Sequence, residues 1–366
     1  MKVILSGRTI ELQSLHPQLD TAFKNLYAAY FGSYALSWEE FVIAGKKLFT
    51  QYPVDYARHD GYFNNFTGIW NSHLATGNFD HAEHIWEMAF EPALAWEAEN
   101  KPNMLHKGSG YYFWSMTALL RGDLDKGYSL MHQAVAEDIR ITGKPIPDTP
   151  AYALVSLNFG KGDQAFRQWV FNQARFLDSL QNQYSSVYGR AFHLEDFKNK
   201  FLLTTTETST VFLFAYAVAR LLQLRQAPSH SLQSEFAGQL EMNILFDLTL
   251  VIDAALKTKD GKTKFVDHAI YLSTAIGTPF TLQQLQKVNA DYNQDFNGTL
   301  LRALQGTYAL PGSQPLSKPQ ADLAIAYGIR NHAAHDLNAS PTVWQHFDEI
   351  VRVIINVLFA TVDYLY

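Results

Sequence analysis

The sequence of 366 residues contains no cysteine. This absence excludes a disulfide framework and any metal site built on thiolates, and it fits a reducing compartment such as the cytoplasm. Charged residues are also few, at 17%, and the net charge of −6 gives no global attraction for nucleic acid. Any nucleic-acid contact therefore needs a local basic patch. The first twenty residues lack the basic start and apolar run of a signal peptide, so we expect a cytoplasmic protein.

Long hydrophobic runs are scarce as well. The most apolar stretch near the middle of the chain, Val211 to Leu222, is too short to span a bilayer and predicts a core helix, so we expect no membrane contact. The first residues alternate around Ser6-Gly7 and predict a short hairpin. Helical periodicity runs through almost all of the remaining chain. These patterns predict an all-α protein with more than one helical substructure.

Two segments in the first half of the chain repeat each other, "LATGNFDHAEHIWEMAF" and "LLRGDLDKGYSLMHQAV". When Gly77 is aligned with Gly122, each glycine is followed by Asn or Asp, which marks the end of one helix and the start of the next. Small residues recur at positions 82 and 127 and at 89 and 134, with a large residue between them at 86 and 131. This pattern lets neighbouring helices approach closely and predicts successive helical hairpins.

The pattern resembles the turn and second helix of a tetratricopeptide repeat (TPR). Gly77 and Gly122 are 45 residues apart, and a weaker third copy begins 38 residues later at Gly160. The standard repeat has a period of about 34 residues, so the helices or loops must be longer here. We therefore expect a TPR-like helical repeat region over 20–232, after an N-terminal segment of residues 1–19. A generic stack of helical hairpins is the alternative.

Proline and serine at 228–231 mark the predicted boundary to a C-terminal helical bundle over 233–366. This region begins with a long apolar helix, "LEMNILFDLTLVIDAALK", followed by a lysine-rich turn and a further helix. A Pro/Gly/Ser loop then precedes "ADLAIAYGIRNHAAHDL" and an apolar final helix. Its length of about 130 residues suffices for a compact domain.

One motif in this bundle has the residues for RNA cleavage by the strand's own 2′-hydroxyl, Arg330-Asn331-His332-Ala333-Ala334-His335. That reaction needs a group that moves protons near neutral pH, and histidine is suited to the task. It also needs a permanent positive charge for the phosphate in the transition state, which a guanidinium supplies through two hydrogen bonds at once. The chemistry requires no metal.

The motif resembles the signature of HEPN domains, in which Arg and a polar residue precede His at this separation. The resemblance covers about 233–366, including the terminal helix. It implies a metal-independent endoribonuclease that needs no cofactor and acts as a homodimer on RNA. It also implies that Arg330 stabilises the phosphate, that His335 is the general acid or base, and that Asn331 orients a partner group or contacts phosphate.

Two other interpretations of the motif stay open. One is a surface arginine next to a helix-capping histidine, and the other is a degenerate HEPN domain that binds RNA without cutting it. The same spacing also occurs at Arg225 and His230, where Pro228 and the linker position indicate a coincidence.

Helix geometry constrains how the motif can work. Five residues at about 100° each place Arg330 and His335 about 140° apart on a regular helix, so they cannot converge on one phosphate there. Either the helix breaks near 333–335, or two copies of the motif meet across a two-fold axis. The second option predicts a homodimer, which the very apolar helices at 240–256 and 350–361 favour. Gly328 is a candidate for a close helix contact at that interface.

A lysine-rich turn is the most basic patch of the bundle. Its four lysines surround Asp260-Gly261, and we predict that they contact RNA phosphate, with a solvated turn as the alternative. They are Lys257, Lys259, Lys262 and Lys264. Two acidic residues, Asp247 and Asp253, interrupt the preceding apolar helix. They either face the motif and tune its histidine or lie at a solvated or partner-facing position.

Pairs of histidines do not predict a metal site here. His332 and His335 with Asp336, and His81 with His84, lack a convincing third ligand, so we expect no bound metal.

Two functions compete. The first is a HEPN-type endoribonuclease whose repeat region binds a regulatory protein or peptide. This combination resembles bacterial defence and toxin proteins, in which a ribonuclease is restrained until it is triggered. The second is a TPR-like scaffold or adaptor that dimerises through an inert HEPN-like bundle. Metal-independent RNA cutting separates the two.

Overall fold

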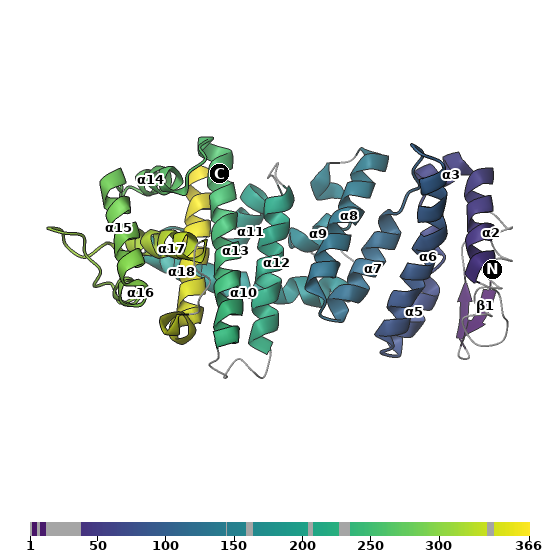
Figure 1. The fold of residues 1–366 in the computed structure, drawn as a ribbon, viewed down its shortest axis with the longest axis horizontal. Coiled ribbons are helices and arrows are strands. Elements are labelled where there is room, and N and C mark those ends of the chain that lie inside the picture. The colour runs from purple at the N-terminus through teal and green to yellow at the C-terminus, as the bar shows by residue number, and fades with distance from the viewer. Residues whose placement is uncertain are drawn as a thin grey trace. The chain divides into compact units, whose positions relative to one another are not determined.

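The computed structural model describes residues 2–5, 8–11, 38–143, 145–158, 164–203, 208–226, 235–334 and 340–366. For some of these residues it describes the backbone only, namely 2–5, 8–11, 38–40, 164–166, 235 and 236. Apart from one β-hairpin, the regular elements of these residues are helices (Figure 1), so the protein is all-α in class. The chain forms two compact units, Met1–Tyr152 (unit 1) and Ala153–Tyr366 (unit 2).

Unit 1 begins with the predicted hairpin, in which β1 (Lys2–Leu5) pairs antiparallel with β2 (Arg8–Glu11). Seven helices follow among the residues that the structure describes in this unit. They are α2 (Trp38–Gln51), α3 (Pro53–Arg58), α4 (Gly61–Asn64), α5 (Thr67–Ala75), α6 (Phe79–Glu99), α7 (Gly108–Leu120) and α8 (Leu124–Thr142), with a 3-10 turn at Ile146–Asp148.

The two aligned glycines occupy equivalent positions, one between α5 and α6 and the other between α7 and α8. Gly77 has φ +72° and Gly122 has φ +83°, the left-handed conformation that glycine adopts without strain at a helix end. Each glycine amide donates to the carbonyl three residues earlier at 3.0 Å. The following residue, Asn78 or Asp123, then caps the next helix with its side chain. The two glycine-centred turns are therefore the same local structure.

The residues that follow the glycines also match in burial. All of them are buried, as the small–large–small pattern predicts: Ala82, Trp86 and Ala89 in α6, and Gly127, Met131 and Ala134 in α8. A Cβ atom on Gly127 would lie 2.5 Å from Leu119 Cδ2, so this glycine lets α8 contact α7 closely. The third predicted copy begins at Gly160, which lies outside the described residues.

Unit 2 contains the helices from α9 onward. After α9 (Tyr152–Val155), which begins at the unit boundary, they are α10 (Gln164–Tyr188), α11 (Leu194–Phe197), a π-helical segment (Lys198–Leu202), α12 (Thr208–Gln226), α13 (Glu235–Asp260), α14 (Phe265–Ala275), α15 (Leu282–Gln294), α16 (Phe296–Leu304), α17 (Lys318–Ala333) and α18 (Pro341–Leu365).

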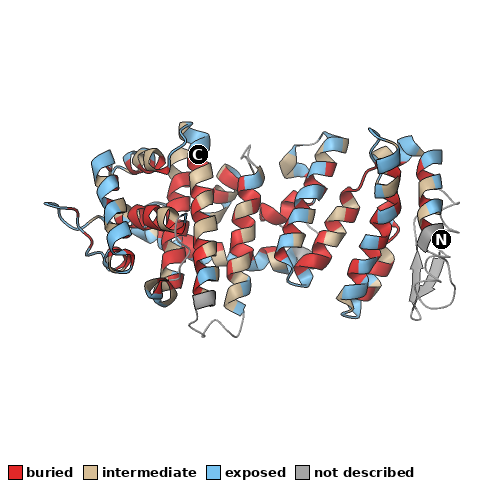
Figure 2. Cartoon of the chain, in the orientation of Figure 1, coloured by how far each residue is buried: buried red, intermediate tan, exposed pale blue. Residues whose placement is uncertain are grey.

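The core of unit 2 is the contact between α13 and α18, which run side by side in Figure 1. Helix α12 packs on α13, helix α10 packs on α18, and α17 contacts both central helices. Buried residues therefore line α12, α13 and α18 along much of their length (Figure 2). The predicted core helix at 211–222 lies inside α12 and is mostly buried, as expected.

Unit 2 begins at Ala153, well before the predicted start of the bundle at residue 233. The reason is that α10 to α12 pack on the bundle helices. Arg190 forms a two-pronged ion pair with Asp363 of α18, and the Tyr184 hydroxyl donates to the same carboxylate at 2.9 Å. Tyr188 donates to the buried Asp322 of α17 at 3.4 Å. The stretch 227–234, which holds the predicted boundary, lies outside the described residues.

Burial perturbs one carboxyl group of α13 strongly. Glu241 is 7% exposed, and its Oε2 has no hydrogen-bond partner among the described residues. Burial, followed by the charge of Asp348, raises the pKa of Glu241 from 4.5 to about 7. A raised pKa in the folded state means that the folded chain binds this proton more tightly than the unfolded chain. The resulting stability is complete below about pH 4.5 and is lost as the pH rises through about 7.

We therefore expect Glu241→Gln to be more stable than the wild type at pH 8, by at most about 3 kcal/mol, and to lose this advantage below pH 4.5. Glutamine keeps the shape of the side chain but carries no charge. Urea unfolding at several pH values measures the difference. The exposed Glu195→Gln is the control and should follow the wild type. An equal advantage at both pH values would contradict the burial argument.

Candidate functional site

The motif lies at the carboxyl end of α17. This helix begins with a capping box, in which the side chain of Ser317 accepts the backbone amide of Gln320 and the side chain of Gln320 accepts the backbone amide of Ser317. Pro319 lies in the first turn of the helix. Its middle is buried, and Arg330 and Asn331 fall in the last turn, where the side chains become partly exposed. His335 lies outside the described residues, so its distance from Arg330 stays untested.

Arg330 is held from one side only. Its Nη2 donates to Asp253 Oδ2 of α13 at 3.1 Å, and its Cζ lies 5.6 Å from the centre of the Phe265 ring at the start of α14. The Arg330 side chain is 29% exposed. Its buried Nε has no hydrogen-bond partner among the described residues. The guanidinium is therefore anchored by Asp253, and its exposed part is open to a ligand.

Asp253 connects Arg330 to a buried histidine. Its second oxygen, Oδ1, lies 3.4 Å from Nε2 of His268 in α14, which is fully buried. The other ring nitrogen of His268, Nδ1, lies 2.7 Å from Asp260 Oδ2 at the end of α13. Asp260 Oδ1 in turn accepts the Lys262 amide at 2.9 Å. Polar side chains thus lie between Arg330 and the lysine-rich turn, but they do not form a continuous hydrogen-bonded chain, because His268 Nε2 has no hydrogen-bond partner among the described residues.

Sequence reasoning left open whether the two acidic residues of α13 face the motif. Asp253 does face it, through Arg330, whereas Asp247 pairs with Arg220 of α12 at 2.9 Å. His268 and Asp260 were missed as site residues. The only sequence signal was an aspartate at one helix end followed, across a glycine turn, by a histidine in the first turns of the next helix. That pattern is too common to indicate a site by itself.

Asn331 points toward α15. Its Nδ2 donates to Asn289 Oδ1 at 3.0 Å, and its side chain also hydrogen-bonds Tyr327. Burial raises the pKa of Tyr327, and the hydrogen bond from Asn331 opposes this shift. His332 stacks on Phe296, with ring centres 3.9 Å apart. These contacts fix the last turn of α17 against α15 and α16.

All four lysines of the basic turn are exposed, and none of them forms an ion pair with a described carboxylate. Lys257 and Lys259 lie in the last turn of α13, and Lys264 is the residue before α14, immediately preceding Phe265, without a capping bond from its side chain. Lys259 Nζ lies 3.5 Å from the centre of the Tyr366 ring. Because Phe265 packs beneath Arg330, the fold places the start of α14, and with it Lys264, beside the motif.

The competing pair, Arg225 and His230, has another environment. Arg225 donates to Asp348 Oδ1 at 2.5 and 3.1 Å and lies 4.9 Å from the Phe176 ring centre. His230 lies outside the described residues. Arg225 therefore ties α12 to α18 as a packing residue.

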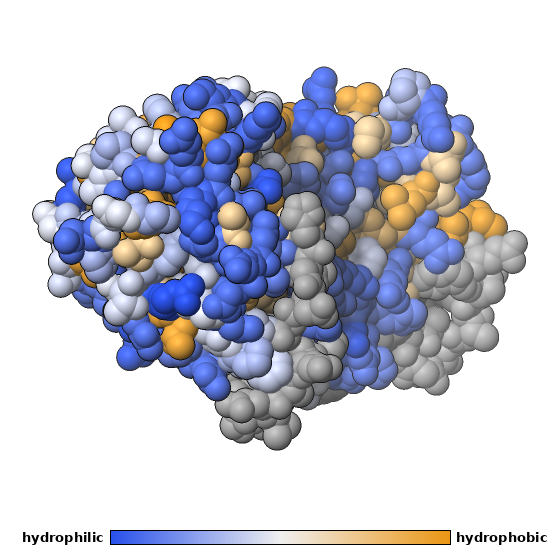
Figure 3. Space-filling model, turned by 60° about the vertical axis from the view of Figure 1, so that its left-hand side comes forward, coloured by the Kyte–Doolittle hydropathy of each residue, from blue (hydrophilic) through white to orange (hydrophobic). Residues whose placement is uncertain are grey.

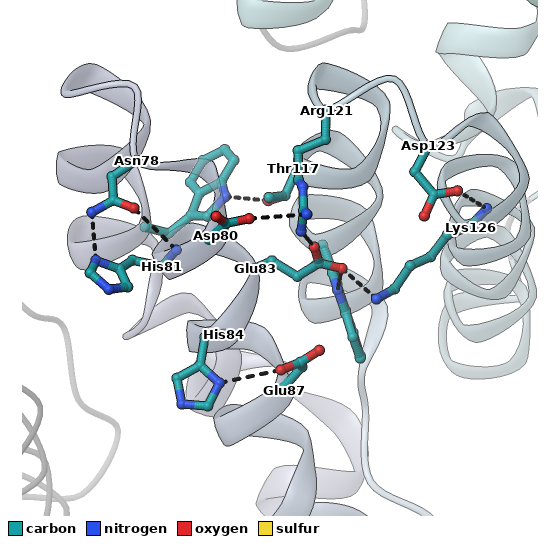
Figure 4. A network of polar contacts seen from close by, with 12 residues as sticks. Asn78, Asp80, His81, Glu83, His84, Glu87, Thr117, Arg121, Asp123 and Lys126 are labelled. Atoms are coloured by element: carbon teal, nitrogen blue, oxygen red, sulfur yellow. Dashed lines mark hydrogen bonds and ion pairs between the residues drawn. The ribbon is translucent and has the colours of Figure 1, made fainter.

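The described residues contain no group of three or more His, Asp or Glu side chains arranged to hold a metal. In unit 1, His81 contacts Asn78 at 2.5 Å, and His84 contacts Glu87 at 3.2 Å (Figure 4). His335 and Asp336 lie outside the described residues.

Unit 1 contains a second polar cluster, centred on Glu83 of α6 (Figure 4). This carboxylate is nearly buried and forms ion pairs with Arg121, after α7, and Lys126 of α8, while Trp114 donates to it at 3.4 Å. Arg121 also pairs with Asp80 at 3.0 Å. Both cations are therefore engaged within the chain, and the cluster joins the two aligned hairpins.

Comparison with known protein families, curated proteins and solved structures gave no match to this chain. Among the described residues, no helix combines the length and the apolar character needed to cross a membrane.

Proposed function

We propose that unit 2 carries a metal-independent endoribonuclease site of HEPN type, centred on Arg330, Asn331 and His335. The observation that carries the proposal is the state of Arg330. Its guanidinium is half-buried, is held by a single ion pair to Asp253 and keeps Nε free of described partners. Because the side chain is 29% exposed and the described residues supply a single ion pair, the exposed part of the guanidinium is available to an anionic ligand.

On this proposal the 2′-hydroxyl of RNA attacks the adjacent phosphorus, and the bond from phosphorus to the 5′-oxygen breaks. A cyclic phosphate and a free 5′-hydroxyl result, so no water or metal enters the step. Arg330 binds the phosphate oxygens as their negative charge grows. His335 takes the proton from the 2′-hydroxyl or gives one to the departing 5′-oxygen. Asn331 keeps the end of α17 in place through Asn289.

The exposed lysines extend the site along an RNA strand. They lie around the end of α13 and the start of α14 without described carboxylate partners. The charge of a lysine that is not neutralised by the protein is available to phosphate. Because the chain as a whole carries −6, this local patch is where RNA phosphates meet positive charge.

The repeat region supports the alternative function, a TPR-like scaffold. The equivalent turns at Gly77 and Gly122, and the Glu83 cluster between the hairpins, support regularly stacked helix pairs. We propose that this region binds a protein or peptide that controls the ribonuclease, in the manner of a restrained defence or toxin protein. Absence of RNA cutting, with partner binding intact, would favour the scaffold.

The apolar surface that favoured a homodimer is buried within unit 2. The helices at 240–256 and 350–361 are buried inside unit 2, by each other and by α10, α12 and α17. Gly328, a candidate for the interface, instead lets Tyr292 of the same chain pack closely, since a Cβ there would lie 2.6 Å from the ring. Over unit 2, the face drawn in Figure 3 is largely hydrophilic with separate apolar spots. What still favours a dimer is the divergence of Arg330 and His335 on a regular helix.

We expect the full-length chain to form a dimer through unit 2 at tens of micromolar. The full chain must be used, because a fragment from residue 233 would expose the faces that α10 and α12 cover. Light scattering gives the mass. A monomer of 41.5 kDa at this concentration would mean that the site works within one chain or does not cut.

Alanine at Lys257, Lys262 and Lys264 should weaken RNA binding uniformly across sequences. For single strands, each lost phosphate contact lowers the slope of log K against log salt by about 0.7, so the triple variant should lose about 2. Fluorescence anisotropy with a 2′-O-methylated RNA, which cannot be cut by its own hydroxyl, measures the slope. Lys287→Ala, an exposed lysine of α15 that pairs with Asp291, is the control and should leave the slope unchanged.

Arg330→Ala and His335→Ala should slow cutting strongly without unfolding the protein. Loss of the phosphate-binding charge should slow cleavage by about 10²–10³-fold. Loss of the proton-transfer group should slow it by about 10²–10⁴-fold. Cutting of a fluorescent RNA in EDTA is measured beside the melting temperature.

Arg225→Ala and His230→Ala are the matched controls for these variants, because this pair has the same spacing in the sequence. Both should cut like the wild type. If the Arg330 and His335 variants also cut like the wild type, the ribonuclease proposal fails. If they are inactive only because they are unfolded, the motif is structural.

A further inference from the structure

Arg190 lies between α10 and α11, and its guanidinium is fixed in orientation. Its Nε donates to Asp363 Oδ2 at 2.5 Å and its Nη2 donates to Asp363 Oδ1 at 3.1 Å, so two hydrogen bonds define the plane of the group. The guanidinium carbon lies over the Tyr364 ring, 4.3 Å from its centre. The carboxylate therefore holds one edge of the guanidinium, and the ring covers one face.

The side chain of Arg190 is nevertheless 43% exposed. Because one edge and one face of the guanidinium are covered, solvent reaches the group at its opposite face and its remaining edge. Unpaired bases of RNA stack on guanidinium planes as they do on aromatic rings. The plane of Arg190 is fixed before a base arrives, so less rotamer entropy is lost when the base stacks.

The charges around Arg190 favour a polyanion. Asp363 faces both Arg190 and Lys200, whose Nζ lies 3.9 Å from Oδ1, and it also accepts the Tyr184 hydroxyl. The Asp363 side chain is only 5% exposed, whereas that of Lys200 is 36% exposed. One buried negative charge therefore faces two cations that reach the solvent. The surface around them carries an excess of positive charge, which attracts phosphate.

The end of α18 connects Arg190 to the lysine-rich turn. The Tyr366 ring lies under Lys259 Nζ at 3.5 Å and meets Phe201 edge-on, with ring centres 5.9 Å apart. Phe201 belongs to the same π-helical segment as Lys200. The basic turn and Arg190 thus both border the last residues of α18. A strand whose phosphates bind the turn can continue across the end of this helix to Arg190.

We propose that Arg190 is the stacking platform for one unpaired base of an RNA whose phosphates bind the lysine-rich turn. Because its ligand is RNA, the platform rests on the proposed function, although not on the cutting step. Arg190 contributes to the affinity for RNA and not to the cleavage chemistry. The substrate class is then single-stranded RNA, since a base inside a duplex has no free face for the guanidinium.

Arg190→Lys keeps the positive charge and removes the plane, so it separates stacking from charge. The probe is a 2′-O-methylated single-stranded RNA that carries 2-aminopurine, a base whose fluorescence falls when it stacks, at one position that is moved along the strand. Bound to the full-length wild type, one position should be quenched. Arg190→Lys should restore the signal there and weaken binding about fivefold to a hundredfold, the effect of one stacked base. The dependence of binding on salt should not change, because the charge is kept.

The chain supplies a matched control at the start of α18. Arg225 also donates from Nε and Nη2 to one aspartate, Asp348, and its Cζ lies 4.9 Å from the Phe176 ring centre. Its side chain is 27% exposed, and Asp348 is itself 58% exposed, so the negative charge there reaches the solvent, unlike that of Asp363. Arg225→Lys should change the melting temperature about as much as Arg190→Lys and should leave the quenching and the affinity unchanged.

Tyr364→Leu is the second variant, and it covers the case in which Arg190→Lys disturbs the fold. It keeps the ion pair between Arg190 and Asp363 and removes the ring beneath the guanidinium, so part of the signal should return at the same position. The platform is overturned if neither variant changes the quenching, or if bound RNA has no quenched position. Arg190 then only ties α10 to α18 or receives an aromatic side chain of a partner protein.

The same samples separate the platform from the proposed ribonuclease. If the wild type quenches the probe as expected and cuts no unmodified RNA, the ribonuclease proposal fails and the platform stands. If it cuts RNA and Arg190→Lys binds and quenches like the wild type, only the platform fails. A wild type that binds no RNA would contradict both.

Discussion

The contact between α13 and α18 is the constraint on which unit 2 depends. Both helices are long and apolar, and each buries several faces because further helices, among them α10, α12, α16 and α17, pack on the pair. At about 25 cal/mol per Å² of apolar surface, such burial outweighs any of the polar contacts described. It also explains why α10 to α12 belong to this unit. Their apolar faces pack on the central pair of helices, and ion pairs such as Arg190–Asp363 fix the orientation in which they pack.

The candidate site lies at the end of the packed region, where α17 leaves its contacts with α13 and α18. Helix α17 is buried through most of its length against α13 and α18, and Arg330 emerges in its last turn. The same helix α13 supplies both Asp253, which holds the guanidinium, and the lysines at its end. One rigid element therefore positions the anchor of Arg330 and the basic patch together. A site built on helices is held more precisely than one built on loops.

Polar groups are used differently in the two units. In unit 1, Glu83 is surrounded by Arg121, Lys126 and Trp114, so its charges are balanced inside the hairpin stack. In unit 2, the lysines of the basic turn lack described acidic partners, and Arg330 keeps a donor without one. Balanced clusters hold a structure together, whereas unbalanced charge is available to a ligand. This contrast is why the proposed chemistry is assigned to unit 2.

The sequence by itself determined the local features. Glycine followed by Asn or Asp, with small and large residues at helical spacing, defined the equivalent turns at Gly77 and Gly122, because these depend on backbone conformation and on neighbours within one hairpin. The sequence also placed Arg330 in the C-terminal bundle, with a helix break near 333–335 as one of two options. Only the tertiary structure decided that Asp253 faces Arg330 while Asp247 faces Arg220, and that the buried His268 lies beside Asp253. Both aspartates interrupt the same apolar helix, and their roles depend on which neighbouring helix lies opposite each one. That arrangement is set by long-range packing. The same packing explains why the second unit begins at Ala153, before the predicted boundary, and why the apolar faces that had suggested a dimer are buried.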